Sequence, residues 1–275
     1  MPTVTILTDN TVAVPFPKGL RGEWGFAAAV DDVLFDTGQS ETAFHNANLL
    51  GIGAGFETIV LSHAHFDHTA GLPSFLNRMT NPTIYCHPEV WEPRYVVAEG
   101  AMVDLPRERL PIGMPLAEAE VENSAEVMTH RDPVEVSSGI YALGEIPRPH
   151  PDTTVGKIEE GDELVDDPVV DDQAIAIETG EGVGLILGCC HAGLLNTIEH
   201  AEEVSGGEVR YVLGGTHLVA LDDEEVHQVA DALEGKLDLF CGTHCTGFEA
   251  ESILAERFPD AFRFVGVGSR IELPP

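Results

Sequence analysis

The sequence predicts an α/β fold, because strand-like and helix-like segments alternate along its 275 residues. In the second half, apolar runs at 183–188, 209–213 and 237–241 are typical of buried strands, and a segment with helical periodicity follows each. Shorter strand-like runs, many with β-branched residues, lie at 3–9, 25–30, 33–35, 58–61, 83–86, 141–143, 174–177 and 262–267. We expect one domain spanning 1–275, with its ligands at the strand ends.

The densest group of metal-ligand side chains directly follows the run at 58–61. It reads H-x-H-x-D-H and comprises His63, His65, Asp67 and His68. In an extended segment His63 and His65 project from the same side, so their imidazoles can bind one ion. Asp67 and His68 begin the next turn and can face a neighbouring ion. The motif therefore predicts a site for two metal ions.

Each strand-loop-helix unit of the second half places a histidine in the loop after its strand. These residues are His191, His217 and His244. One histidine at such a position is weak evidence for a metal site. Three together indicate that these loops supply the metal ligands that the H-x-H-x-D-H motif lacks. In the first half, Asp36 and Thr37 follow a predicted strand. They could orient metal ligands through hydrogen bonds, and a simple turn explains them equally well.

The composition narrows the range of partners. There are 47 acidic and 14 basic residues, which give a net charge of -33, so nucleic acid and anionic membranes are excluded as partners. Such acidity is typical of cytosolic proteins from salt-loving archaea, and it predicts that the fold loosens at low salt. Five cysteines without a C-x-x-C pair favour a reducing compartment. We expect a soluble, cytoplasmic protein that acts on a small molecule, in an oligomeric state that the sequence leaves open.

Between residues 87 and 133 the sequence shows no strand or helix periodicity. Its prolines and acidic residues predict an irregular insertion there. This insertion could cap the active site, and a surface loop without a role is the alternative. Arginines in or near it could bind a phosphate, although solvated side chains are the simpler interpretation. They are Arg94, Arg107, Arg109, Arg131 and Arg148.

Taken together, these residues resemble the metallo-β-lactamase fold superfamily, whose signature is the H-x-H-x-D-H motif. The chain resembles most closely the subgroup often named 7,8-dihydropterin-6-yl-methyl-4-(β-D-ribofuranosyl)aminobenzene-5'-phosphate synthase. The matching segments span nearly the whole chain in order: 22–26, 35–40, 61–71, 171–174, 188–193, 214–218 and 244–247. The resemblance implies a four-layer αββα sandwich with its ligands in loops.

The resemblance also implies two divalent metal ions. Zinc suits a shell of histidine and aspartate best, and manganese or iron are also compatible with it. The implied ligands of the first metal are His63, His65 and His191. Those of the second are Asp67, His68 and His244, with His217 as the alternative to His244.

One position departs from the commonest pattern of the superfamily. Where an aspartate usually follows the strand at 183–188, this chain has Cys189. Either the Cys189 thiolate or Asp172 could replace the carboxylate that bridges the metals.

The resemblance implies a metal-dependent hydrolase. Paired metals would activate water against a phosphoester, a lactone or a related bond, and the subgroup's name adds a pterin or ribose-phosphate compound as substrate. Asp67 could also orient or deprotonate that water. The alternative is a protein that binds metal without hydrolysis, or an iron redox protein on the same scaffold.

Overall fold

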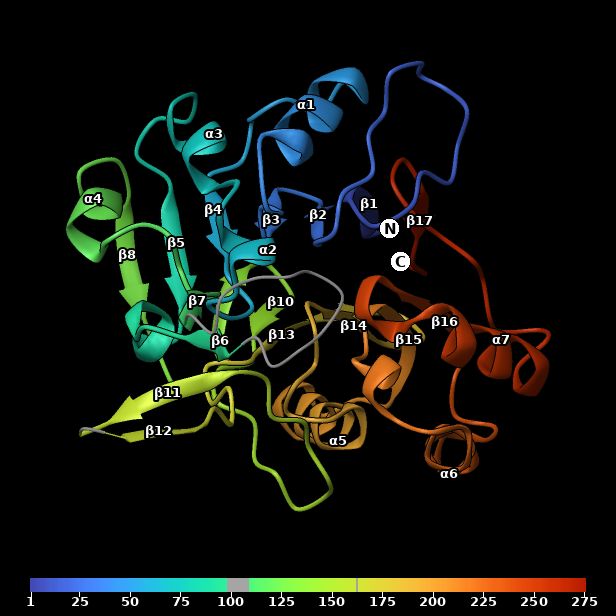
Figure 1. The fold of residues 1–275 in the computed structure, drawn as a ribbon. Helices are drawn as coiled ribbons and strands as arrows, with labels where there is room; N and C mark the ends of the chain where they lie inside the picture. Colours follow the sequence, from blue (N-terminus) through green and yellow to red (C-terminus); the bar gives the residue numbers. More distant parts are fainter. Residues whose placement is uncertain (98–108, 162) are drawn as a thin grey trace.

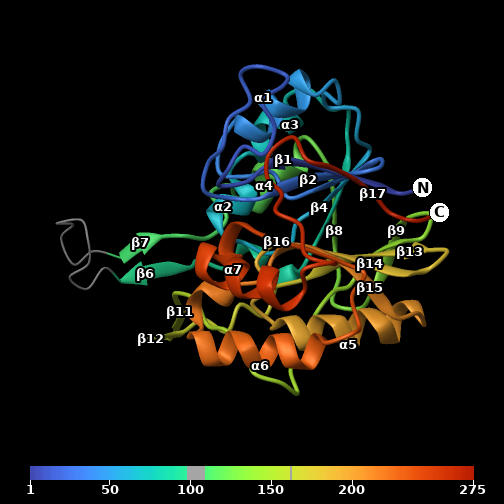
Figure 2. The same ribbon diagram turned by 90° about the vertical axis from the view of Figure 1, so that its right-hand side faces the viewer.

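The computed structural model describes residues 1–97, 109–161 and 163–275. Two large β-sheets pack face to face, and helices cover both outer faces (Figure 1). The view turned by 90° shows helices α1 and α3 on one side of the paired sheets and α5 and α6 on the other (Figure 2). This arrangement is the predicted αββα sandwich. No helix in the described part of the chain is long and apolar enough to cross a membrane.

The first sheet has seven strands in the order β17-β1-β2-β3-β4-β5-β8. Their bounds are β17 (Arg270–Glu272), β1 (Thr3–Thr8), β2 (Ala27–Val30), β3 (Val33–Phe35), β4 (Thr58–Val60), β5 (Thr83–Cys86) and β8 (Glu126–Thr129). From β3 to β8 the neighbouring strands are parallel. The helical segments of this half are α1 (Thr42–Leu49), α2 (Phe66–Thr69), α3 (Leu72–Leu76), η1 (Pro88–Trp91) and α4 (Glu118–Glu122).

The second sheet has six strands in the order β16-β15-β14-β13-β10-β9. Their bounds are β16 (Leu239–Thr243), β15 (Val209–Gly215), β14 (Gly182–Leu187), β13 (Ala174–Thr179), β10 (Ile140–Ala142) and β9 (Val134–Ser137). The helical segments are α5 (Leu194–Ser205), η2 (Leu218–Ala220), α6 (Asp223–Leu233), η3 (His244–Thr246) and α7 (Phe248–Arg257). Because β14, β15 and β16 are parallel, their carboxyl ends and the loops that follow lie at one edge.

Alternation of side chains along the strands builds three apolar layers. In β2, Ala28 and Val30 face the second sheet, whereas Ala27 and Ala29 belong to the layer beneath α1. The opposite face of the second sheet packs against α5, α6 and α7. Two of these helices have residues at their ends that favour those ends. Gly206 ends α5 with a left-handed φ of 71°, and Asp222 begins α6 with a capping box.

The range 87–133 is not irregular throughout, so this prediction was wrong in part. Its described residues form β6 (Tyr95–Val97), β7 (Arg109–Pro111), α4 and β8, while 98–108 lie outside the described residues. A small third sheet has the order β12-β11-β6-β7, with β11 (Lys157–Glu160) and β12 (Glu163–Asp166). Pro111 is tolerated there because β7 is an edge strand. Because these strands are short and prolines interrupt the segment, the hydrophobic periodicity of the sequence does not reveal them.

The predicted final strand at 262–267 is also absent. Phe262 and Val267 make only isolated bridges, to Phe240 and Val12. The strand that closes the chain is β17, which pairs with β1. Gly268, with a φ of 88°, turns the chain between the predicted strand and the observed one.

Candidate metal centre

The sequence-predicted metal ligands come together between the two sheets. His63 and His65 follow β4, and α2 carries Asp67 and His68. The loops after β14 and β16 bring the second half to the same place, since Cys189 lies 3.2 Å from His68. Both halves of the chain therefore contribute to one cluster.

The first group of ligands is His63, His65 and His191. One donor atom of each lies within 4.8 Å of the others, and Nε2 of His63 is 2.9 Å from Nδ1 of His65. Within the described chain, Nε2 of His65 and Nε2 of His191 are buried without a hydrogen-bond partner. Burial, reinforced by neighbouring positive charges, lowers the pKa of all three imidazoles well below the ordinary value. Neutral imidazoles that converge in this way, two of them with an unpartnered nitrogen, fit a transition metal.

The second group is Asp67, His68 and His244. Oδ2 of Asp67 lies 3.5 Å from Nε2 of His244 and 3.9 Å from Nε2 of His68. Burial and the charge of His68 lower the pKa of His244 to about 3. Burial also disfavours the charged form of His68, but Asp36 and Asp67 outweigh it and raise the pKa of His68 to about 9. A carboxylate and two imidazoles form a donor set that suits zinc or iron.

Asp36 and Thr37 hold His68 in place, as their position after a strand suggested. Oδ2 of Asp36 lies 2.7 Å from Nδ1 of His68, which leaves Nε2 directed into the site. The Thr37 hydroxyl donates to the backbone carbonyl of His68 at 3.0 Å. Ser62 was not predicted. Its hydroxyl donates to Asp36 at 2.7 Å and lies 2.9 Å from Nδ1 of His63, so it links the two ligand groups.

His244 is held by residues from the other end of the chain. Oδ1 of Asp9 accepts the backbone N–H of His244 at 3.0 Å, and Oδ1 of Asn10 lies 3.1 Å from Nδ1 of its ring. The ring of Trp24 makes an edge contact with a centroid separation of 5.3 Å. The sequence gives no local signal for these contacts beyond the position of Asp9 and Asn10 after a strand.

The structure separates the two histidines that the sequence left as alternatives. His244 lies with Asp67 and His68, whereas the ring of His217 is 4.5 Å from that of His191. Nδ1 of His217 is buried without a hydrogen-bond partner in the described chain. His217 therefore borders the first group rather than the second.

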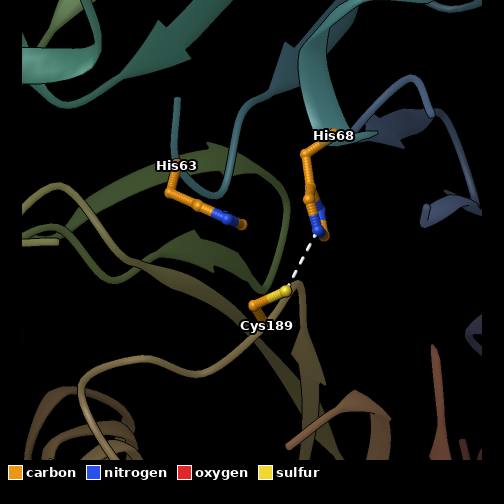
Figure 3. Close-up of side chains that lie close together, drawn as sticks. All are labelled: His63, His68 and Cys189. Carbon is orange, nitrogen blue, oxygen red and sulfur yellow. Dashed lines mark hydrogen bonds between the residues drawn. The ribbon is translucent and has the colours of Figure 1, made fainter. Parts of the chain in front are cut away.

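The two candidates for the bridge also lie differently. Cys189 Sγ is 3.2 Å from Nε2 of His68 and 3.4 Å from Nε2 of His244 (Figure 3 shows the first contact). Asp172 instead accepts the backbone N–H of Ala192 at 2.8 Å, and burial raises the pKa of its carboxyl to about 7. Asp172 belongs to none of the groups of three or more converging donor atoms in the described part of the chain.

The arginines that could have bound phosphate are paired with acidic groups. Arg94 is buried, and its guanidinium lies 2.8 Å from Asp167 and 2.7 Å from Asp171. Asp171 in turn accepts the backbone N–H of Ala64, between the first two histidines of the motif, at 2.8 Å. The other pairs are Arg109 with Glu159, Arg131 with Glu89 and Glu145, and Arg148 with Asp152. Arg107 lies outside the described residues.

Comparisons with known proteins agree with this architecture. The family model of the metallo-beta-lactamase superfamily matches residues 31–192. A relative from Methanocaldococcus jannaschii, 7,8-dihydropterin-6-methyl-4-(beta-D-ribofuranosyl)-aminobenzene-5'-phosphate synthase, is 31% identical over 259 residues, covering 87% of this chain and 84% of its own.

Two solved structures share the fold. One is Tm1679, a metal-dependent hydrolase of the beta-lactamase superfamily, with a TM-score of 0.85, 24% identity and full coverage of both chains. The other is Zn2+-bound PqqB from Methylobacterium extorquens, with a TM-score of 0.57, 12% identity and coverage of 98% of this chain and 100% of its own.

Proposed function

The chain belongs to the metallo-β-lactamase superfamily, and from this premise we propose that it is a hydrolase with two divalent metal ions. The observation that carries the proposal is the pair of ligand groups. His63, His65 and His191 form one group, and a second group of one carboxylate and two imidazoles lies beside it. Each group can hold one ion, and their closeness would let both ions act on one bond.

Two bound ions would supply Lewis acids that activate a water molecule and stabilise negative charge on the attacked group. The chain's own residues position the reaction. Asp67 has one oxygen near His244 and a side chain that is 10% exposed, so it can both bind metal and accept a hydrogen bond from water. Asp36 fixes the ring of His68 through a 2.7 Å contact. We assign Asp67 the role of orienting or deprotonating the attacking water.

We propose phosphoesters, lactones or related esters as the substrate class. The name of the 31% identical relative, which contains a pterin and a ribose-phosphate, extends this proposal to pterin or ribose-phosphate compounds. The described arginines near the site already pair with carboxylates. An anionic group of the substrate would therefore depend on the metals for its charge partners, because few basic side chains remain to bind it.

The test is a substrate panel on metal-free protein reloaded with zinc, manganese or iron in molar salt. The panel contains a phosphodiester, a phosphomonoester, a lactone and a thioester. We expect turnover of at least one class, its loss in Asp67→Asn and His65→Ala, and its retention in His227→Ala, which changes an exposed histidine of α6.

Metal stoichiometry is measured on the same samples. His65→Ala should lose metal from the first group, and His227→Ala should bind as much as the wild type. Bound metal without turnover on any substrate would reject the hydrolase and favour a binding protein, and an iron-dependent redox spectrum would favour the redox alternative. Full metal content in His65→Ala would reject the assigned ligands.

A further inference from the structure

Cys189 lies where the two ligand groups meet. Its Sγ is 3.2 Å from Nε2 of His68 and 3.4 Å from Nε2 of His244, both members of the second group. Donor atoms of Cys189 and His63 also converge within 4.8 Å, as do those of Cys189 and His191 in the first group. Figure 3 shows Cys189 below His63 and His68, with a dashed line from its sulfur to the ring of His68. The thiol can therefore reach both metal positions.

The carboxylate alternative does not have this geometry. Oδ2 of Asp172 is engaged by the backbone of Ala192, and Oδ1 is buried without a partner in the described residues. Asp172 belongs to none of the groups of three or more converging donor atoms among the described residues, whereas Cys189 belongs to three. Among the two candidates for a shared ligand, the positions of the donor atoms favour sulfur.

We propose that Cys189 binds both metal ions as a shared thiolate, in place of an oxygen bridge. The proposal rests on the proposed metal site and deepens it. On binding, the S–H bond breaks, the proton leaves to solvent, and the sulfur electron pairs form the bonds to the ions. Two backbone features support this placement. Gly188 lets the strand end pack closely on Ser62, and Cys190, with a φ of 61°, has its Sγ 3.3 Å from the Thr197 hydroxyl on α5.

A shared thiolate determines which metals the site prefers. Thiolates are soft ligands that favour zinc, cobalt and iron over manganese and magnesium, whereas a carboxylate bridge favours the harder ions. We therefore expect the wild type to retain zinc in the presence of excess manganese. Cys189→Asp should still bind two ions but lose much of this preference.

The test uses cobalt, because thiolate-to-cobalt charge transfer absorbs in the near ultraviolet. Metal-free protein is titrated with cobalt(II), and the band should grow over two equivalents, since one sulfur serves both ions. The band should be absent in Cys189→Ser. Cys190→Ser is the matched control and should retain the band, because Sγ of Cys190 lies 3.3 Å from the Thr197 hydroxyl on α5.

A measurement on the unmodified protein covers the case in which Cys189→Ser fails to fold. X-ray absorption of the zinc-loaded wild type should show a sulfur neighbour at about 2.3 Å from zinc. No sulfur there, or a band that survives in Cys189→Ser, would overturn the proposal. Cys245 is also buried and groups with Cys189 and His244. A band that is lost in Cys245→Ser instead would therefore assign the sulfur to Cys245 and overturn the proposal. A band complete after one equivalent would also overturn it, because Cys189 would then bind a single ion.

The two proposals can fail separately. An active cobalt protein without the charge-transfer band would keep the hydrolase and reject the thiolate. A protein with the band and no turnover on the panel would keep the thiolate and reject the hydrolase.

Discussion

Asp36→Asn probes how the fold prepares His68 for metal. The two side chains are fully buried and 2.7 Å apart, and the pKa of His68 rises from the ordinary 6.5 to about 9. Burial alone would lower that pKa, so the charges of Asp36 and Asp67 outweigh it. In the metal-free protein His68 is therefore protonated at neutral pH and forms an ion pair with Asp36. Asparagine keeps the shape of the side chain and removes the charge.

The sign and size of the effect follow from proton linkage. A histidine whose pKa is raised on folding stabilises the fold below its unfolded pKa of 6.5, and this stabilisation is lost as the pH rises through about 9. With these two values the linkage contributes roughly 2–3 kcal/mol at pH 7. Asp36→Asn should lose most of this amount. The loss is an upper value, because the variant also avoids burying the carboxylate.

The assay is urea unfolding of the metal-free protein in one fixed molar salt at about pH 6, 7 and 9.5. We expect Asp36→Asn to be less stable than the wild type by about 2–3 kcal/mol at the two lower values, and the difference to shrink towards zero at the highest. The exposed Asp260→Asn serves as control and should show no such trend. An equal difference at all three pH values would refute the reasoning, since it would show that the ion pair with His68 is not its source.

Three further predictions concern packing and charge. In Gly188→Ala the new methyl group would collide with the Ser62 hydroxyl. We therefore expect roughly 1–3 kcal/mol of destabilisation, and weaker metal binding measured by titration. The control Gly55→Ala should be unchanged, because its Cβ would meet only one atom, at 4.0 Å. Arg94→Ala should cost about 3–5 kcal/mol in urea unfolding, because it leaves two buried carboxylates unpaired, whereas the exposed pair of Arg109 should be worth at most about 1 kcal/mol. Equal losses of unfolding free energy in Arg94→Ala and Arg109→Ala would contradict this expectation. A net charge of -33 predicts a lower melting temperature in millimolar than in molar salt, and equal values would contradict the role of self-repulsion.

The strands that precede the site could be predicted from the sequence because they are apolar and buried, even where they are as short as β3 and β4. The parallel strands β14, β15 and β16 are apolar and almost wholly buried, and a loop with predicted ligands follows each of them. The small third sheet was missed because its short strands have no fully buried side chain, unlike β3 and β4, and because β11 and β12 carry acidic residues. Their pairing depends on neighbours distant in sequence, which periodicity cannot show.

Residues that position the ligands were predicted only where they lie near a motif or a strand end. Asp36 follows β3 and could be proposed, but Ser62 has no distinguishing pattern even though it contacts both Asp36 and His63. Asp9 and His244 are separated by 235 positions and meet only in the folded chain. Such contacts are set by the packing of the two sheets, which a single sequence does not reveal.

The backbone at the site shows why the ligand geometry itself could not be derived from the sequence. Asp36, His217 and His244 follow strands and adopt left-handed conformations, with φ of 57°, 51° and 53°. Non-glycine residues avoid this region at a cost of about 1–2 kcal/mol each, so the surrounding structure must compensate. At His244 the compensation comes from the end of β1, where Asp9 accepts its N–H and Asn10 donates to its carbonyl at 3.1 Å. The turn that aims this imidazole at the second metal position is therefore imposed by the first strand of the chain, which lies more than two hundred residues away from it in sequence.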